Sequence, residues 1–211
     1  MVAPLLPSRR QLWKAGLTRQ RLSSPGAHGA SRLKDRAPVQ RLNPRVLPGL
    51  LVSFDQLLGE AGSFRNLFSA ARKRGFDVEA EVQKAMSMDS ELFRIVGYTV
   101  EKVGDGEAAL SFPYSPAVAR RGGMVHGGVI MYTLDNVCGI AVMTVNSGVD
   151  QLTMELKVNF LEPLEKGPFT AAGRVVRAGR TVVVAEGEVR DAAGKVCAKS
   201  LGTWYMIRKG R

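Results

Sequence analysis

Residues 120–139 of this 211-residue chain read RRGGMVHGGVIMYTLDNVCG, a glycine-rich turn followed by an apolar segment that carries a single acid. Apolar residues recur in this segment at helical spacing, which predicts a long helix that is buried over most of its surface. Asp135 lies in the middle of the segment, where an uncompensated carboxylate is costly. Gly139 follows one turn later and is expected to leave room beside the acid. We therefore expect a reactive site on this helix.

The runs on either side of this helix predict short strands. FRIVGYTVEKVG and GEAALSFPYSP precede it and flank Gly104-Asp105-Gly106, a hairpin turn signal. Four further runs follow it: QLTMELKVNFLEP, PFTAAGRVVRAG, TVVVAEGEVRD and KVCAKSLGTWYMI. Consecutive hairpins imply an antiparallel sheet, and one apolar helix would cover one face of that sheet. The expected fold is α+β, with an antiparallel β-sheet around one long central helix, and residues 86–211 form this domain.

The first 85 residues differ in charge from the rest of the chain. They hold 15 Lys and Arg against 6 Asp and Glu, whereas residues 86–211 hold 15 against 13. A uniform nucleic-acid-binding surface would not concentrate the excess positive charge in the first 85 residues, so no nucleic-acid partner is expected. No apolar run is judged long enough for a membrane span, so no membrane partner is expected either. Cys138 and Cys197 have no metal or CxxC spacing, which favours buried thiols in a reducing compartment and a cytoplasmic location.

Residues 1–50 are rich in Arg, Pro, Ser and Gly and are predicted to be a disordered basic extension. Three explanations stay open. The segment could be a basic arm for anionic partners, a transit peptide, or sequence that lies upstream of a true start at Met86 or Met88. The last is favoured because the globular pattern begins there.

Residues 51–85 are predicted to form a helical segment of one or two amphipathic helices. Ser53 or Ser63 is the expected N-cap, and Gly75 is the expected stop. No chemistry is expected of this segment, and the simplest interpretation is a helical hairpin that rests on the following domain.

The start of the predicted helix could stabilise a negative charge. The first amides of a helix lack intrahelical acceptors and lie at the positive end of its dipole, where an oxyanion is well placed. The glycines at this point either allow that approach or only make a tight turn; they are Gly122, Gly123, Gly127 and Gly128. His126 has no partner histidine at metal spacing, so no metal site is expected, and a capping role is favoured over a general base. Asp135 is either catalytic or a structural carboxylate.

The spacing between two of these residues implies a second subunit. Gly127 and Asp135 are eight residues apart, which is about 12 Å along one helix. One acyl carbonyl cannot reach both within hydrogen-bond distance. If both act on it, the two residues come from different subunits whose helices run antiparallel, and the site requires a dimer.

These residues resemble a known family. The run GxxHGGxxxxxxD, from Gly123 through His126 to Asp135, is similar to that of the hotdog-fold acyl-CoA thioesterases of the PaaI type. The resemblance covers residues 88–208 and includes the segments TMELKVNFLEP and RVVRAGRTVVVAEGEV. It implies a hotdog fold, homodimers that often pair into dimers of dimers, and hydrolysis of an acyl-CoA substrate without a cofactor.

The resemblance also implies roles for single residues. Gly127 would supply an oxyanion-hole amide, Asp135 would be the nucleophile or general base, and Thr153 would orient water. The expected substrate-binding residues are His126, Gly128, Arg120, Arg177 and Arg180. The chain departs from the pattern at Arg120, where many relatives have Asn.

The arginines near the predicted hairpin before TVVVAEGEV have two interpretations. Arg177 and Arg180 could meet the phosphates of CoA or could be solvated turn residues. The function expected is an acyl-CoA thioesterase that hydrolyses an aromatic or medium-chain acyl-CoA to free acid and CoA. A hydratase or dehydratase on the same fold and a non-catalytic acyl-CoA-binding protein are the alternatives. The Arg120 departure keeps the second of these open.

Overall fold

A computed structural model describes residues 54–208, and these residues belong to one compact unit. The extension predicted at residues 1–50 and the possible cap Ser53 lie outside the described residues. The elements follow in the order α1 (Phe54–Ala61), α2 (Phe64–Lys73), α3 (Val78–Asp89), α4 (Glu91–Val96), β1 (Thr99–Gly104), β2 (Glu107–Phe112), α5 (Gly127–Val145), β3 (Asp150–Phe160), β4 (Phe169–Ala178), β5 (Val182–Arg190) and β6 (Val196–Ile207).

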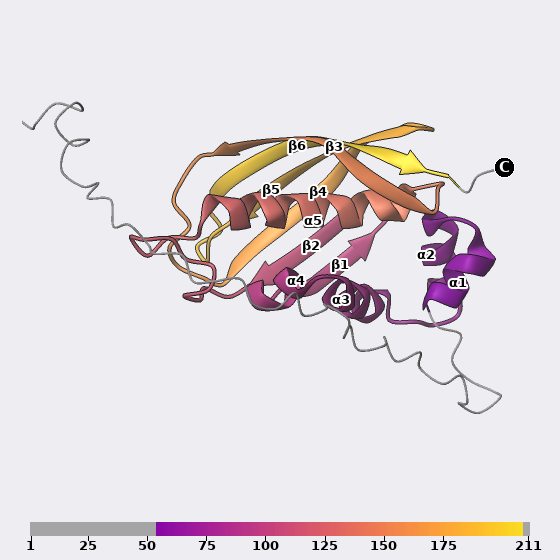
Figure 1. The fold of residues 1–211 in the computed structure, drawn as a ribbon, viewed down its shortest axis with the longest axis horizontal. Helices are drawn as coiled ribbons and strands as arrows, with labels where there is room; N and C mark the ends of the chain where they lie inside the picture. The colour runs from indigo at the N-terminus through magenta and orange to yellow at the C-terminus, as the bar shows by residue number, and fades with distance from the viewer. Residues whose placement is uncertain (1–53, 209–211) are drawn as a thin grey trace, which may run out of the picture. The chain divides into compact units, whose positions relative to one another are not determined.

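The strands form one six-stranded sheet in the order β1-β2-β4-β5-β6-β3, and every neighbouring pair is antiparallel (Figure 1). The predicted α+β fold with one long helix and an antiparallel sheet is confirmed. The prediction that the last four strands form consecutive hairpins is wrong, because β3 pairs with β6 and not with β4. Leu161 and Glu162 donate their amides to the Cys197 carbonyl and hold the chain against β6 just where a hairpin to β4 would turn.

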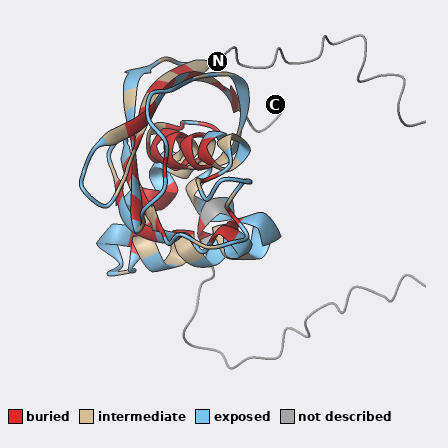
Figure 2. Cartoon of the chain, turned by 90° about the vertical axis from the view of Figure 1, so that its left-hand side faces the viewer, coloured by how far each residue is buried: buried red, intermediate tan, exposed pale blue. Residues whose placement is uncertain are grey.

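Helix α5 packs against one face of the sheet, and Figure 2 shows the sheet curving around this buried helix. Glycines in two central strands let the helix approach closely. A Cβ atom on Gly173 would lie 2.6 Å from the Val137 carbonyl oxygen, and one on Gly187 would lie 2.7 Å from Cys138 Sγ. These contacts are too short for any side chain, so glycine at these positions sets the distance between helix and sheet.

The expectation that no apolar run is long enough for a membrane span is wrong. By length and composition, Gly127–Val145 could cross a membrane, and it is the only described helix that could. Half of this stretch is buried inside the protein, because the sheet covers it. A helix in the core of a protein can have the same apolar composition as a membrane span.

The helices before the sheet share its core. Ser63 is the N-cap of α2, as predicted, and its Oγ accepts from the Asn66 amide at 3.3 Å. Gly75 follows α2 with φ +76°, as expected of a helix stop. Buried side chains of α2 and α3 belong to the same apolar cluster as α5 and the sheet; they are Phe68, Ala71, Val78 and Val82. A domain boundary at residue 86 would cut through α3.

One predicted strand begins later than expected. The run FRIVGYTVEKVG was interpreted as a strand, but Glu91–Val96 is helix α4, and β1 begins only at Thr99. Ser90 Oγ accepts from the Phe93 amide at 3.3 Å and caps the start of this helix. Gly97 ends it in the left-handed conformation, with φ 77°. Caps at both ends therefore outweigh the β-branched residues inside this short segment.

Candidate active site

His126 caps the start of α5. Its Nδ1 accepts from the Gly128 amide at 2.9 Å, and a Cβ on Gly128 would lie only 3.0 Å from that nitrogen. Gly128 therefore leaves space for the imidazole ring. The capping role favoured from the sequence is confirmed, and while Nδ1 accepts this hydrogen bond it is not available to take a proton from a substrate.

The Gly127 amide is the first of α5 and has no acceptor among the residues that the structure describes. Gly127 lines a hollow of about 340 Å³ at the positive end of the helix dipole. Most of the hollow's walls are apolar, contributed by Met124, Val125, Ile130, Phe160, Leu161, Pro163 and Leu164. An amide donor without an acceptor in such a hollow can bind a carbonyl oxygen that develops negative charge.

Asp135 and Thr153 lie together, although they are distant in sequence. Thr153 Oγ1 donates to Asp135 Oδ1 at 2.9 Å, from the strand β3 to the half-buried middle of α5. The β3–β6 register shifts between Thr153 and Glu155, a bulge of the kind that redirects side chains beside functional sites. A carboxylate held by one oxygen can take a proton from water or attack a carbonyl carbon with the other.

Gln151, which sequence reasoning missed, occupies the space beside Gly139. Its Nε2 donates to the Gly139 carbonyl at 2.7 Å and lies 3.6 Å from where a Cβ of Gly139 would be. The room expected one turn after Asp135 is therefore filled by the protein itself. Nothing in the sequence around Gln151 signalled this contact.

The structure does not bring Gly127 and Asp135 together within one chain. Both lie on α5 at the spacing of about 12 Å expected for eight helical residues. The hollow beside Gly127 is lined by neither Asp135 nor Thr153. Within one chain, the two halves of the predicted arrangement are therefore separate.

Arg120 lines the same hollow as Gly127. Its Nη1 lies 3.7 Å from Met124 Sδ, and no described acid forms an ion pair with it. Glu162, the one carboxylate in the lining, pairs with Lys195 at 2.9 Å. The guanidinium of Arg120 is therefore the uncompensated charge of this hollow.

Arg177 and Arg180 lie on the β4–β5 hairpin and do not line the hollow beside Gly127. A third arginine joins them, since Arg208 Nη2 donates to the Arg180 carbonyl at 2.5 Å. Sequence reasoning missed Arg208, and the basic end of the chain, IRKGR, was the available signal. All three are exposed, and none forms an ion pair with an acid in the described part of the chain.

A metal-binding cluster and a reactive cysteine are the other site types to consider in the described residues. No group of three His, Cys, Asp or Glu side chains gathers in residues 54–208 in a way that could hold a metal ion. Cys138 and Cys197 are free and buried. Burial raises the pKa of the Cys138 thiol to about 12, so the thiol stays uncharged at neutral pH and is a poor nucleophile.

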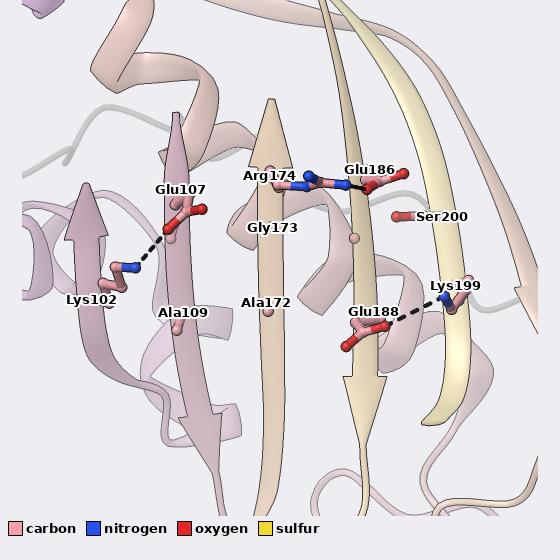
Figure 3. Close-up of a pocket in the computed structure, with 12 residues that line it drawn as sticks. Lys102, Glu107, Ala109, Ala172, Gly173, Arg174, Glu186, Glu188, Lys199 and Ser200 are labelled. Atoms are coloured by element: carbon pink, nitrogen blue, oxygen red, sulfur yellow. Dashed lines mark hydrogen bonds and ion pairs between the residues drawn. The ribbon is translucent and has the colours of Figure 1, made fainter. Parts of the chain in front are cut away.

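A larger hollow, of about 450 Å³, lies on the face of the sheet opposite α5 (Figure 3). Its charged side chains pair with one another across neighbouring strands, as Lys102 does with Glu107 at 2.6 Å and Lys199 with Glu188 at 3.6 Å. It contains none of the predicted site residues. Size alone therefore does not identify the site, and the smaller hollow at the start of α5 is the better candidate.

Comparison with known proteins finds relatives that are named as thioesterases or esterases. The model of a family described as Thioesterase superfamily matches residues 122–198, which run from the glycine turn before α5 into β6. "Putative esterase SSO2140" of Saccharolobus solfataricus is 44% identical over 127 residues, which cover 60% of this chain and 91% of that protein.

Two more distant proteins carry more specific names. The "Medium/long-chain acyl-CoA thioesterase YigI" of Salmonella typhimurium is 27% identical over 148 residues, covering 59% of this chain and 95% of that protein. The crystal structure of a thioesterase family protein from Silicibacter pomeroyi superposes with a TM-score of 0.57 at 27% identity, and the match covers 62% of this chain and 99% of that one.

Proposed function

The chain belongs to the thioesterase superfamily and has its hotdog fold, and from that premise we propose that it hydrolyses acyl-CoA thioesters to the free acid and CoA. Membership supports thioester hydrolysis in general. The acyl-CoA part of the proposal is supported by the name of one relative, the YigI thioesterase. The observation that carries the chemistry is the hydrogen bond from Thr153 Oγ1 to Asp135 Oδ1, which orients the carboxylate.

In the proposed reaction, water adds to the thioester carbon and the carbon–sulfur bond breaks. Asp135 takes a proton from that water, or attacks the carbon directly to give an anhydride that water then opens. The oxygen of the tetrahedral intermediate is negative, and the Gly127 amide donates to it. In the first route the proton that Asp135 took from water passes to the departing sulfur; in the second, CoA leaves as the thiolate and is protonated by water. Thr153 acts by holding the carboxylate in place.

The proposal includes a site shared between two copies of the chain. One copy contributes the hollow beside Gly127, and the other contributes Asp135 and Thr153, because about 12 Å of helix separates them in one chain. Strand β3 supports this, since it is an edge strand whose one partner among the described strands is β6. Large apolar side chains on and just after β3 are 52–62% exposed in a single chain; they are Leu152, Met154, Phe160 and Leu161. Antiparallel pairing of two β3 strands would cover such an edge.

Substrate contacts follow from the same arrangement. The apolar walls beside Gly127 suit an aromatic or medium-chain acyl group, with Arg120 at the polar side of the hollow. Arg177 and Arg180, with Arg208 beside them, are the proposed partners of the CoA phosphates. A dimer of dimers stays a prediction from the resemblance. A cytoplasmic location is also proposed, supported by the two free cysteines.

The test is release of free CoA thiol from a panel of aromatic and straight-chain acyl-CoAs, followed with a thiol reagent. Both cysteines are buried, so the folded protein adds little background. Asp135→Asn is the matched control protein. Thiol release by the wild type alone supports the proposal. Acyl-CoA binding without thiol release would indicate a binding protein, and water addition to an enoyl-CoA would indicate a hydratase; either result contradicts the proposal.

A further inference from the structure

The sheet has two edge strands, β1 and β3, and their outward backbone groups differ in what they contact. An edge strand exposes amides and carbonyls that can pair with a strand of another chain. Among the described elements, β3 has no neighbour beyond β6. Strand β1 also has one strand neighbour, β2, but helix α3 runs beside it.

Side chains of α3 bind the outward backbone groups of β1. Glu79 Oε1 accepts from the Val103 amide at 2.9 Å. Gln83 binds the strand twice, since its Oε1 accepts from the Val100 amide at 2.8 Å and its Nε2 donates to the Tyr98 carbonyl at 3.0 Å. These are the donors and acceptors that an added strand would use.

Helix α2 contributes a further contact at the same edge. Arg72 Nη2 donates to the Val103 carbonyl, and its Nη1 lies 3.4 Å from Asp105 Oδ1. Val103 therefore has both its amide and its carbonyl bound by helix side chains. Val78 and Val82 hold α3 in this position through the buried core.

We propose that α2 and α3 close the β1 edge to strand addition, so that a second copy of the chain can add only at β3. Two β3 strands pair with each other about a two-fold axis, and such an assembly stops at two copies per sheet. Pairing of β1 with β3 would be head-to-tail and could continue without end. The expectation of two copies per sheet depends on the β3 pairing in the proposed function. The closure of β1 depends only on the contacts that α2 and α3 make with that strand.

The opposing interpretation is that these hydrogen bonds only fasten α3 to the sheet. The two interpretations differ in what happens when the bonds are removed. A purely structural role predicts lower stability with no change in the size of the assembly. Edge closure predicts larger assemblies that grow with protein concentration.

The test compares Glu79→Ala/Gln83→Ala with wild type and with Glu81→Ala in the full chain. Glu81 is on the same helix, and its loss changes the charge equally but removes no described contact to β1. Sedimentation velocity over a range of concentrations gives the mass. We expect the double variant to exceed the wild-type mass by at least about twofold at high concentration, since each added copy contributes a whole chain. Glu79→Gln keeps an oxygen acceptor for Val103 and should retain the wild-type mass.

A double variant that unfolds cooperatively and keeps the wild-type mass at every concentration overturns the proposal. If the double variant does not fold, the single variants Glu79→Ala and Gln83→Ala decide by the same criterion. Thioester hydrolysis measured in parallel separates this proposal from the proposed function. The wild type could be a monomer while the double variant forms assemblies whose mass rises with protein concentration. That result would support the closure of the β1 edge and refute the shared site.

Discussion

At the residue scale, the contact between Asp135 and Thr153 joins side chains 18 positions apart. One carboxylate oxygen accepts from the threonine hydroxyl, and the other has no donor among the described residues. A carboxylate that is oriented but keeps one oxygen open suits proton transfer or nucleophilic attack. The alternative, a structural carboxylate, is also compatible with one oxygen in contact with water at this half-buried position, so the Asn variant is needed to separate the two roles.

Replacing Asp135 with Asn tests the role of its charge. Asn keeps the volume and an oxygen that accepts from Thr153, so the fold and the assembly should not change. It cannot take a proton or attack a carbonyl, so turnover should fall by on the order of 10² to 10⁴. Steady-state hydrolysis of the best acyl-CoA measures the loss. A variant that melts at lower temperature or fails to assemble would point to a structural carboxylate, and a stable variant with wild-type turnover would remove Asp135 from the mechanism.

Thr153→Val removes the hydroxyl and keeps the β-branched shape that suits a strand. Turnover should fall by on the order of 10 to 10², because a hydrogen bond to a charged group contributes about 1.5–3 kcal/mol and each 1.4 kcal/mol is about tenfold in rate. Thr153→Ser restores the hydroxyl and should recover most of the activity. The comparison is made on turnover at saturating substrate. A loss as large as that of Asp135→Asn, or no loss at all, would contradict a positioning role.

At the scale of elements, the start of α5 combines a histidine cap with a backbone amide, that of Gly127, which has no acceptor among the described residues. The cap binds the Gly128 amide, whereas the preceding amide, that of Gly127, belongs to a residue that lines the hollow. A cap at this point therefore fixes the direction of the donor as well as the start of the helix.

His126→Ala should lower the free energy of unfolding by about 1 kcal/mol, the usual effect of losing an N-cap. His126→Asn offers a short oxygen acceptor to the same amide and should restore most of that stability. Denaturant unfolding of both variants measures the difference. Equal stability of His126→Ala and wild type, or equal loss in both variants, would show that the contact does not act as a cap.

At the scale of the whole molecule, the proposed division of the site between two copies has a direct test. Gly127 is the first residue of α5, where proline is tolerated, and His126 before it is extended, as a residue before proline prefers to be. Gly127→Pro should thus remove the amide donor without disrupting the helix, although its ring adds carbons near Phe160 in the hollow. We expect it to be inactive, like Asp135→Ala, when each is assayed alone.

Mixed dimers of these two variants should recover activity. One of their two sites would combine an intact Gly127 with an intact Asp135. Random mixing by co-expression gives half mixed dimers with one working site each, so the expected rate is about one quarter of wild type. An inactive mixture of folded, exchanged dimers would place both residues in the same chain.

A chain that starts at Met86 should be much less stable than one that starts at residue 49. It would lack Phe68, Val78 and Val82, each of which stabilises the core by roughly 1.5–3 kcal/mol when fully buried. Their sum is comparable to the net stability of a domain. Thermal unfolding and soluble yield of the two chains make the comparison. Equal stability of both would show that the sheet and α5 fold without the preceding helices.

Local residue spacing determined most of the elements of this protein. Periodicity predicted the central helix and the strands after it, because side-chain spacing follows directly from backbone geometry. The cap at Ser63 and the role of His126 followed from the same local chemistry. The run HGG with Asp135 eight residues after Gly127 also predicted that the two halves of the candidate site are separate in one chain, since the rise of a helix converts spacing into distance.

Only the tertiary structure decided how these elements meet. It placed β3 beside β6, which local patterns do not specify because any two strands of suitable length can pair. It brought Thr153 to Asp135 and Gln151 to Gly139, and it turned Glu91–Val96 into a helix. It also laid α3 along β1, so that Glu79 and Gln83 bind backbone groups of a strand. These contacts join residues far apart in the chain, and their energy depends on the whole packed arrangement, which no single segment contains.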